Sequence, residues 1–202
     1  MQLLIVSGSH RAGSQSSKIG RYMAARATDL GVFTSAEHLD LSESEMPFWS
    51  EEAFDAKNEK WQAHLSALNG QLSAAQAYVI ISPEWHGMVP SKLKNLLLFA
   101  NIQTVGHKPA LITAVSASRG GAYPIVELRS SGYKNSRLCF VPEHLIVRNA
   151  NEVLNDGEAS GTEDEFIRGR VDFALRGLGE YARVMAQMDR SVLIDDAYKN
   201  GM

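Results

Sequence analysis

The chain lacks the features that mark secreted and membrane-spanning proteins. It has one cysteine, Cys139, among its 202 residues, so an intrachain disulfide is excluded and a reducing, cytoplasmic location is expected. No stretch approaches the roughly 20 apolar residues of a membrane-spanning helix. The apolar start, Met1 to Val6, has no basic residues before it and ends at Ser7-Gly8-Ser9, which favours a β-strand over a signal peptide.

Excess charge and metal-ligand patterns are also missing. The formal net charge is −3, which gives no electrostatic basis for binding nucleic acid or an anionic membrane. The six histidines show no ligand spacing and a lone cysteine cannot form a thiolate cluster, so no metal site is expected. Cys139 itself, between Leu138 and Phe140, is expected to be a small buried hydrophobic residue.

What is present is the composition of a globular protein, with 45% hydrophobic and 21% charged residues. The length suits a single domain over residues 1–202. Short apolar runs alternate along the chain with segments of helical periodicity. The apolar runs predict strands at residues 3–7, 32–39, 77–81, 110–115 and 138–147. The periodic segments predict helices at residues 16–30, 58–76, 91–101, 122–133 and 163–188.

This alternation predicts an α/β fold, a doubly wound five-stranded parallel sheet of strand order 2-1-3-4-5 with helices on both faces. Ligands of such sheets bind at the carboxyl ends of the strands, where the strand order reverses. The loops after the first, third and fourth strands are therefore the candidate site.

The loop after the first strand, Gly8 to Ser17, holds four serines and Arg11 and leads into a helix. A helix N-terminus presents unpaired N–H groups and the positive end of a dipole, which suits a phosphate, and Arg11 adds a charge-assisted hydrogen bond. The alternative is a plain helix cap formed by Ser14 or Ser16, although one cap does not require so many donors.

Two other kinds of phosphate loop do not fit these residues. Gly8 and Gly13 have the glycine spacing of a Walker A loop, but Ser14 and Gln15 follow where Lys and Ser/Thr are required. The dinucleotide fingerprint G-x-G-x-x-G is absent. The loop therefore favours the single phosphate of a mononucleotide.

The loop after the third strand, Ser82 to Pro90, contains two prolines, a glycine and Trp85. Backbone N–H groups and an aromatic ring together could flank a planar heteroaromatic ring. The alternative is a rigid turn in which Trp85 fills the core. His86 is not expected to be a catalytic base, because adjacent residues of a loop do not point to one place.

The loop after the fourth strand, Ser116 to Ala122, contains the pair Gly120-Gly121. Paired glycines allow a ligand to approach the backbone closely, and a plain flexible turn is the alternative.

Taken together, the three loops resemble the NADPH-dependent FMN reductase family, which includes flavodoxin-like quinone, azo-dye and chromate reductases. The resemblance covers about residues 1 to 147. It is carried by Gly8-Ser9-His10-Arg11-Ala12-Gly13-Ser14, by Pro83-Glu84-Trp85-His86-Gly87 with Pro90 and Leu93-Lys94-Asn95, and by Ser116 through Arg119-Gly120-Gly121 to Leu128-Arg129. It implies a flavodoxin-like fold with FMN as cofactor.

The resemblance also implies roles for individual residues. The FMN phosphate would be held by Ser9, Arg11, Ser14, Ser16 and Ser17. The isoalloxazine edge would be flanked, mainly through backbone atoms, by Pro83, Glu84, Trp85, His86 and Gly87. The other side of the ring would be flanked by Ser116, Gly120 and Gly121. The usual second loop of the family is Pro-Glu-Tyr-Asn-Gly, so Trp85 and His86 are departures that leave backbone contacts possible.

The implied activity is that of an NAD(P)H-dependent oxidoreductase. NADPH or NADH would supply a hydride to FMN, and a small acceptor such as free flavin or a quinone would take the electrons. No protein acid or base is required, so no catalytic side chain is assigned. Two alternatives stay open, namely a non-enzymatic flavodoxin-like electron-transfer protein and a flavin-free binding module.

Family members form dimers or pairs of dimers, so a homodimer or homotetramer is expected. In the helix after the second loop, Leu93, Leu96, Leu97 and Ala100 form one stripe that would cover the sheet. Leu98 and Phe99 point partly away from this stripe and are expected to be exposed in a monomer. An exposed apolar patch beside the flavin loop would suit a symmetric dimer.

Overall fold

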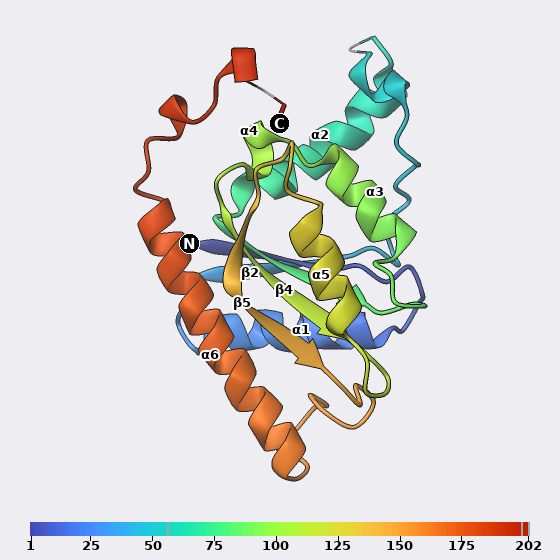
Figure 1. Cartoon of the computed structure of the whole chain (residues 1–202), viewed down its shortest axis with the longest axis vertical. Coiled ribbons are helices and arrows are strands. Elements are labelled where there is room, and N and C mark those ends of the chain that lie inside the picture. Colours follow the sequence, from blue (N-terminus) through green and yellow to red (C-terminus); the bar gives the residue numbers. More distant parts are fainter. Residues whose placement is uncertain (56, 199, 202) are drawn as a thin grey trace.

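The protein folds as a three-layer α/β sandwich around one five-stranded sheet (Figure 1). The computed structural model describes residues 1–55, 57–198 and 200–201. The strands are β1 (Gln2–Ser7), β2 (Ser35–Asp40), β3 (Ala77–Pro83), β4 (Pro109–Val115) and β5 (Cys139–Val147). All neighbouring strands are parallel and their order is β2-β1-β3-β4-β5, which confirms the predicted flavodoxin-like topology.

Six α-helices connect or follow these strands in the described part of the chain. They are α1 (Gln15–Asp29), α2 (Glu59–Ala74), α3 (Ser91–Phe99), α4 (Ile102–Val105), α5 (Ala122–Ser130) and α6 (Thr162–Met185). Short 3₁₀ helices are η1 (Glu51–Phe54), η2 (Arg190–Val192) and η3 (Asp196–Tyr198). The predicted helix 91–101 ends early, because Asn101 and Thr104 form a reciprocal cap that starts α4.

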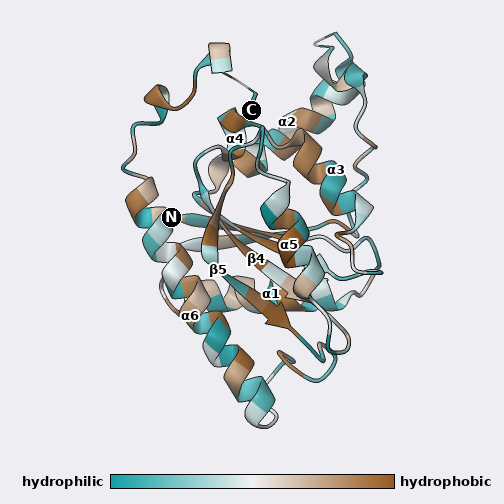
Figure 2. Cartoon of the chain, in the orientation of Figure 1, coloured by the Kyte–Doolittle hydropathy of each residue, from teal (hydrophilic) through white to brown (hydrophobic). Residues whose placement is uncertain are grey.

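The two faces of the sheet are buried by different helices, because side chains alternate along each strand. Leu3 and Ile5 point to the face covered by α1 and α6. Leu4 and Val6 point to the face covered by α2, α3 and α5. Figure 2 shows hydrophobic colouring along the strands and alternating bands along α6.

The edge strand β5 accommodates the proline that interrupts its pattern. Its pairing register with β4 shifts between Ala110 and Ile112, opposite the exposed Pro142. A bulge on an edge strand tolerates the missing N–H of proline, so the predicted fifth strand forms.

One predicted exposure in α3 is wrong. Leu98 is 62% exposed, as expected, but Phe99 is only 6% exposed. The Phe99 ring packs against Trp61 of α2, with ring centroids 5.7 Å apart. The helical stripe marks the side of α3 that faces the sheet, and it does not reveal that a second helix covers Phe99.

Candidate functional site

A cavity of about 330 Å³ lies where the loops after β1, β3 and β4 meet. Of the predicted site residues it is lined by Ser9, Arg11, Ser14, Ser16, Pro83, Glu84 and Trp85. Gln15, Val115, Ala117 and Asn151 also line it. The carboxyl ends of parallel strands thus bring together residues of the three loops that sequence reasoning singled out.

The first loop is shaped by two serine side chains. Ser14 caps α1, and its Oγ accepts a hydrogen bond from the Ser17 N–H at 3.1 Å. Ser9 Oγ accepts one from the Arg11 N–H at 3.2 Å. Gly13 has a φ of +62°, which glycine adopts without strain. The cap alternative is therefore correct for Ser14, yet it uses only one of the four serines.

Two buried polar atoms beside this cap have no hydrogen-bond partner among the described residues, and they test whether a nucleotide fits. They are Ser16 Oγ and Gln15 Oε1, and both residues line the cavity. Leaving a buried polar group unpaired costs about 1–3 kcal/mol. A ligand that forms hydrogen bonds with both atoms would remove this cost and would therefore bind more favourably. A phosphate oxygen suits the Ser16 hydroxyl, and a sugar-alcohol hydroxyl suits the Gln15 oxygen. This donor and this acceptor therefore fit FMN.

The fourth serine, Ser17, does not line the cavity. Its hydroxyl accepts a hydrogen bond from Arg21 Nη1 at 2.7 Å and is buried. Burial opposes ionisation of Asp40 at the end of β2, but hydrogen bonds from Ser17 and Ser42 outweigh it and lower the pKa of Asp40. Ser17 therefore joins α1 to β2 beneath the loop.

The second loop folds back on itself as a tight hairpin. Trp85 and Met88 exchange backbone hydrogen bonds of 3.2 and 3.0 Å. The central residues His86 and Gly87 have φ values of +51° and +74°. Positive φ at both central positions is the type I′ turn, for which Asn-Gly is the preferred sequence and in which His is also tolerated. His86 is exposed at the tip of this turn and Gly87 is half-buried beside it.

The second and third loops are joined by Glu84. Its Oε2 accepts a hydrogen bond from the Gly121 N–H at 2.7 Å, and its own N–H donates to Val115 O at 2.9 Å. A Cβ on Gly120 would lie 2.7 Å from Glu84 Oε1, so a larger residue there would displace the Glu84 carboxylate. The Glu84 carboxylate is thus occupied by the backbone of the third loop.

Arg148, which sequence reasoning missed, holds the same loop from its other side. Its Nε donates to Arg119 O at 2.8 Å and to Gly120 O at 3.1 Å. Ser116 Oγ accepts from the Ser118 N–H at 3.2 Å. Ser116, Gly120 and Gly121 therefore border the cavity without lining it, in a loop whose backbone is tied at several points.

Asn151 was also missed, and it lines the cavity from the loop after β5. The signal was available, since the rule that sends ligands to the carboxyl ends of strands applies equally to the fifth strand. Gln15 was missed because it has no distinguishing neighbour in sequence.

Two further histidines and the cysteine are not arranged for catalysis. His10, in the first loop, is exposed, and its ring meets Trp85 edge-on at 4.6 Å. His107, before β4, is half-buried. Cys139 is half-buried rather than fully buried, and burial raises the pKa of its thiol, so it is not an activated nucleophile.

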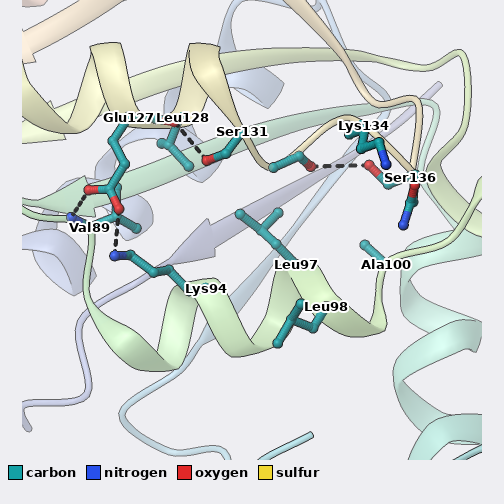
Figure 3. A pocket seen from close by; sticks show the side chains of 12 residues that line it. Val89, Lys94, Leu97, Leu98, Ala100, Glu127, Leu128, Ser131, Lys134 and Ser136 are labelled. Carbon is teal, nitrogen blue, oxygen red and sulfur yellow. Dashed lines mark hydrogen bonds and ion pairs between the residues drawn. The ribbon is translucent and has the colours of Figure 1, made fainter. Parts of the chain in front are cut away.

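A larger hollow, of about 450 Å³, lies between α3 and α5 (Figure 3). At one end Glu127 accepts from the Val89 N–H at 2.7 Å and pairs with Lys94 at 2.5 Å. Its middle is apolar, with Leu97, Leu98 and Leu128. The hollow adjoins the second loop but has none of the first-loop residues that line the smaller cavity.

No helix in the described part of the chain is both long and apolar enough to cross a membrane. No group of three or more histidine, cysteine, aspartate or glutamate side chains within residues 1–55, 57–198 and 200–201 is arranged to hold a metal ion.

Comparison with known proteins adds a family and a fold. The family model that matches is described as NADPH-dependent FMN reductase, and it covers residues 1–152. An NADPH azoreductase from Bacillus sp. (strain OY1-2) is 22% identical over 192 residues, which cover 93% of this chain and 98% of that protein.

Solved structures agree with the architecture. FerB, a flavoenzyme NAD(P)H:(acceptor) oxidoreductase from Paracoccus denitrificans, matches with a TM-score of 0.72 and 18% identity over 91% of this chain and 98% of its own. An azoreductase from Bacillus anthracis matches with a TM-score of 0.56 and 17% identity over 93% of this chain and 99% of its own. At these identities the likeness shows the fold.

Proposed function

The chain belongs to the NADPH-dependent FMN reductase family, and from this premise we propose how its loops hold FMN and which acceptor it serves. It is an FMN-dependent oxidoreductase with NAD(P)H as electron donor. This activity sets aside the electron-transfer and flavin-free alternatives. The whole of residues 1–202 is proposed to be one domain, because α6 packs its buried face on the sheet.

The first loop is proposed to bind the FMN phosphate. Ser9, Arg11, Ser14 and Ser16 contribute to this site, and the unpaired Ser16 hydroxyl is the single observation that carries the assignment. Ser17 supports the loop from behind through Arg21. Gln15 and Asn151 are placed to pair with the ribityl hydroxyls.

The second and third loops are proposed to flank the isoalloxazine ring. Pro83 to Gly87 would lie along one edge, with the type I′ turn holding the Trp85 backbone in place. Ser116, Gly120 and Gly121 would lie on the other side. Glu84 and Arg148 act as positioning residues, because they hold the Gly120-Gly121 backbone from two directions.

When bound, FMN supplies the redox chemistry, accepting a hydride from NAD(P)H and passing electrons to the acceptor. The chain itself orients the reactants. Glu84 is occupied by Gly121, and His86 is exposed at a turn, so neither is assigned a proton-transfer role. Fixed backbone N–H groups at the ring edge would stabilise charge that develops on reduction.

The acceptor is proposed to be a small planar molecule, namely a quinone, an azo compound or free flavin. One relative is described as an NADPH azoreductase, and one similar structure is described as an NAD(P)H:(acceptor) oxidoreductase. The absence of an assigned acid or base fits a site that transfers electrons to acceptors of varied structure. A cytoplasmic location is proposed because the lone cysteine needs no oxidising compartment.

The protein is proposed to be a homodimer through the hollow between α3 and α5 (Figure 3). Four apolar side chains near it are more than half exposed, namely Met88, Leu98, Tyr123 and Val126. A symmetric contact would bury the same patch on both subunits beside the second loop. Two dimers could join into a homotetramer through the outer face of α6, where Phe166, Phe173 and Val184 are exposed at helical spacing.

An absorbance spectrum of the purified protein mixed with FMN tests this function. Bound FMN should change its visible absorption, and NADPH should then bleach it without oxygen. Addition of a quinone should restore the oxidised spectrum. If FMN binds but NADPH does not reduce it, the enzyme assignment is wrong and the electron-transfer alternative is favoured. If FMN does not bind, the flavin-free alternative is favoured.

A further inference from the structure

A second polar cavity lies at the opposite end of the sheet, beside the amino ends of β3 and β4. Its volume is about 200 Å³. Its polar lining comes from three segments that are distant in sequence. They are the end of α2 and the turn before β3, with Ser73 and Gln76, the turn before β4, with His107 and Lys108, and η2, with Arg190. The cavity is therefore assembled only by the tertiary fold and by the segment after α6.

Arg190 lines this cavity with buried hydrogen-bond donors that have no acceptors among the described residues. Its Nε and Nη2 are inaccessible to solvent and have no hydrogen-bond partner in the described part of the chain. A buried charged donor without a partner costs more than a neutral one, at least about 1–3 kcal/mol. The two Arg190 atoms point to a missing acceptor.

Lys108 adds a second buried positive charge. It is 8% exposed, and its Nζ donates to Ser73 O at 2.9 Å and, more weakly, to Leu72 O and the Tyr78 hydroxyl, both at 3.3 Å. Carbonyls and a hydroxyl solvate the ammonium but carry no opposite charge. Burial and, to a smaller extent, Arg190 lower the pKa of Lys108 to about 8, so the charged ammonium is disfavoured mainly by its removal from water.

No carboxylate among the side chains that the structure describes balances these charges. Neither Lys108 nor Arg190 forms an ion pair there. The adjacent acid, Asp189, accepts hydrogen bonds from the N–H and hydroxyl of Ser191, where it caps η2. Arg137, which also acts on His107, is a further cation. Buried charge without a counter-charge is strongly unfavourable, so an anion would relieve it.

We propose that this cavity binds a small inorganic oxyanion of the phosphate or sulfate type. Arg190 Nε and Nη2 would donate to two of its oxygens, as a planar guanidinium does to phosphate. Lys108 would contribute its charge, and Ser73 and Gln76 further polar groups. The volume is below the roughly 300–1,000 Å³ of pockets for drug-sized ligands, but it exceeds the share of several waters at about 30 Å³ each. A free oxyanion therefore fits better than a nucleotide.

Isothermal titration of inorganic phosphate into FMN-saturated protein tests the proposal. FMN saturation keeps phosphate out of the first loop, and sodium chloride maintains constant ionic strength. The unmodified protein should bind phosphate saturably and gain thermal stability with it. Arg190→Gln should raise the phosphate Kd at least tenfold. The matched control Arg176→Gln, at an exposed position of α6, should leave it unchanged.

Three outcomes would overturn the proposal. One is no saturable binding to the unmodified protein, and another is the same Kd in Arg190→Gln as in the unmodified protein. The third is loss of binding in Arg11→Ala, because this would place the phosphate in the first loop. Arg190→Gln should itself stay folded, with a thermal midpoint without phosphate no lower than that of Arg176→Gln, since it removes an unpaired buried charge. Lys108→Met gives an independent variant, which should also weaken phosphate binding.

Discussion

The Glu84 carboxylate accepts a hydrogen bond of 2.7 Å from the backbone N–H of Gly121, and this one contact joins the loops after β3 and β4. The two residues are 37 positions apart. Gly121 has a φ of +108°, a conformation that other residues rarely adopt. This conformation directs the Gly121 N–H toward the Glu84 carboxylate, which accepts its hydrogen bond. The distance between the two walls proposed for the flavin ring is thereby set by a side chain that need not touch the ring.

Replacing Glu84 by alanine should weaken FMN binding while the sheet stays folded. The loss should be about 1.5–3 kcal/mol, the usual value for a hydrogen bond to a charged group. Fluorescence titration with FMN measures it, and Glu163→Ala, at an exposed position of α6, is the control. Equal FMN affinity in Glu84→Ala and the unmodified protein would show that the loop keeps its position without this contact.

Arg11→Ala should weaken FMN binding by about 1.5–3 kcal/mol, because one charge-assisted hydrogen bond to the phosphate is lost. The side chain is exposed and forms no ion pair within the described residues, so thermal stability without FMN should not change. The same titration compares it with Arg176→Ala. An unchanged dissociation constant would place the phosphate elsewhere.

His86 is predicted to matter for the turn rather than for catalysis. His86→Asn keeps a residue that tolerates positive φ, so NAD(P)H oxidation should stay within about tenfold, or 1.4 kcal/mol in barrier. His86→Val should lower the free energy of unfolding by about 1–2 kcal/mol, the cost of a left-handed conformation. Stopped-flow flavin reduction and thermal unfolding measure the two effects. A loss of several orders of magnitude in His86→Asn, with FMN bound, would instead make His86 catalytic.

Leu98→Asp should yield monomers. The side chain is exposed in the isolated chain, so the monomer tolerates a carboxylate, whereas a symmetric interface would bury two of them. Light scattering gives the mass, and Val192→Asp, exposed in the C-terminal segment, is the control. Phe99 must be left intact, because it packs on Trp61. A mass of one chain for the unmodified protein at micromolar concentration would contradict the dimer.

We expect the free energy of unfolding in phosphate-free buffer to depend on pH because of Lys108. Its folded pKa is about 8, below the ordinary value of 10.5. Between these values the unfolded chain binds a proton that the folded chain has released, so stability rises with pH. Relative to Lys108→Met, the unmodified protein should gain about 2 kcal/mol in free energy of unfolding between pH 8 and pH 10. Denaturant unfolding at the two pH values measures it, and a constant difference would show that Lys108 stays charged.

The sequence by itself determined the sheet, its strand order and the position of the first loop. These depend on local patterns, namely short apolar runs, helical periodicity and a serine-rich turn between Ser7 and Gln15. Even the second loop had a local signal, because His86-Gly87 occupies the place of an Asn-Gly turn. Such signals depend on a few consecutive residues, so they can be recognised without knowing which other elements pack nearby.

Only the tertiary structure decided where individual side chains point and which distant groups they meet. Glu84 meets Gly121 of another loop, Phe99 is covered by Trp61, and Arg190 reaches the cavity of Lys108 from 82 positions away. Periodicity identifies the face of a helix that contacts the sheet, but a residue beside that face is buried or exposed according to which other elements pack against it. The partner of Glu84 and the unpaired donors of Arg190 therefore followed from the packing of the layers, because a side chain's hydrogen bonds depend on what the fold brings within about 3 Å of it.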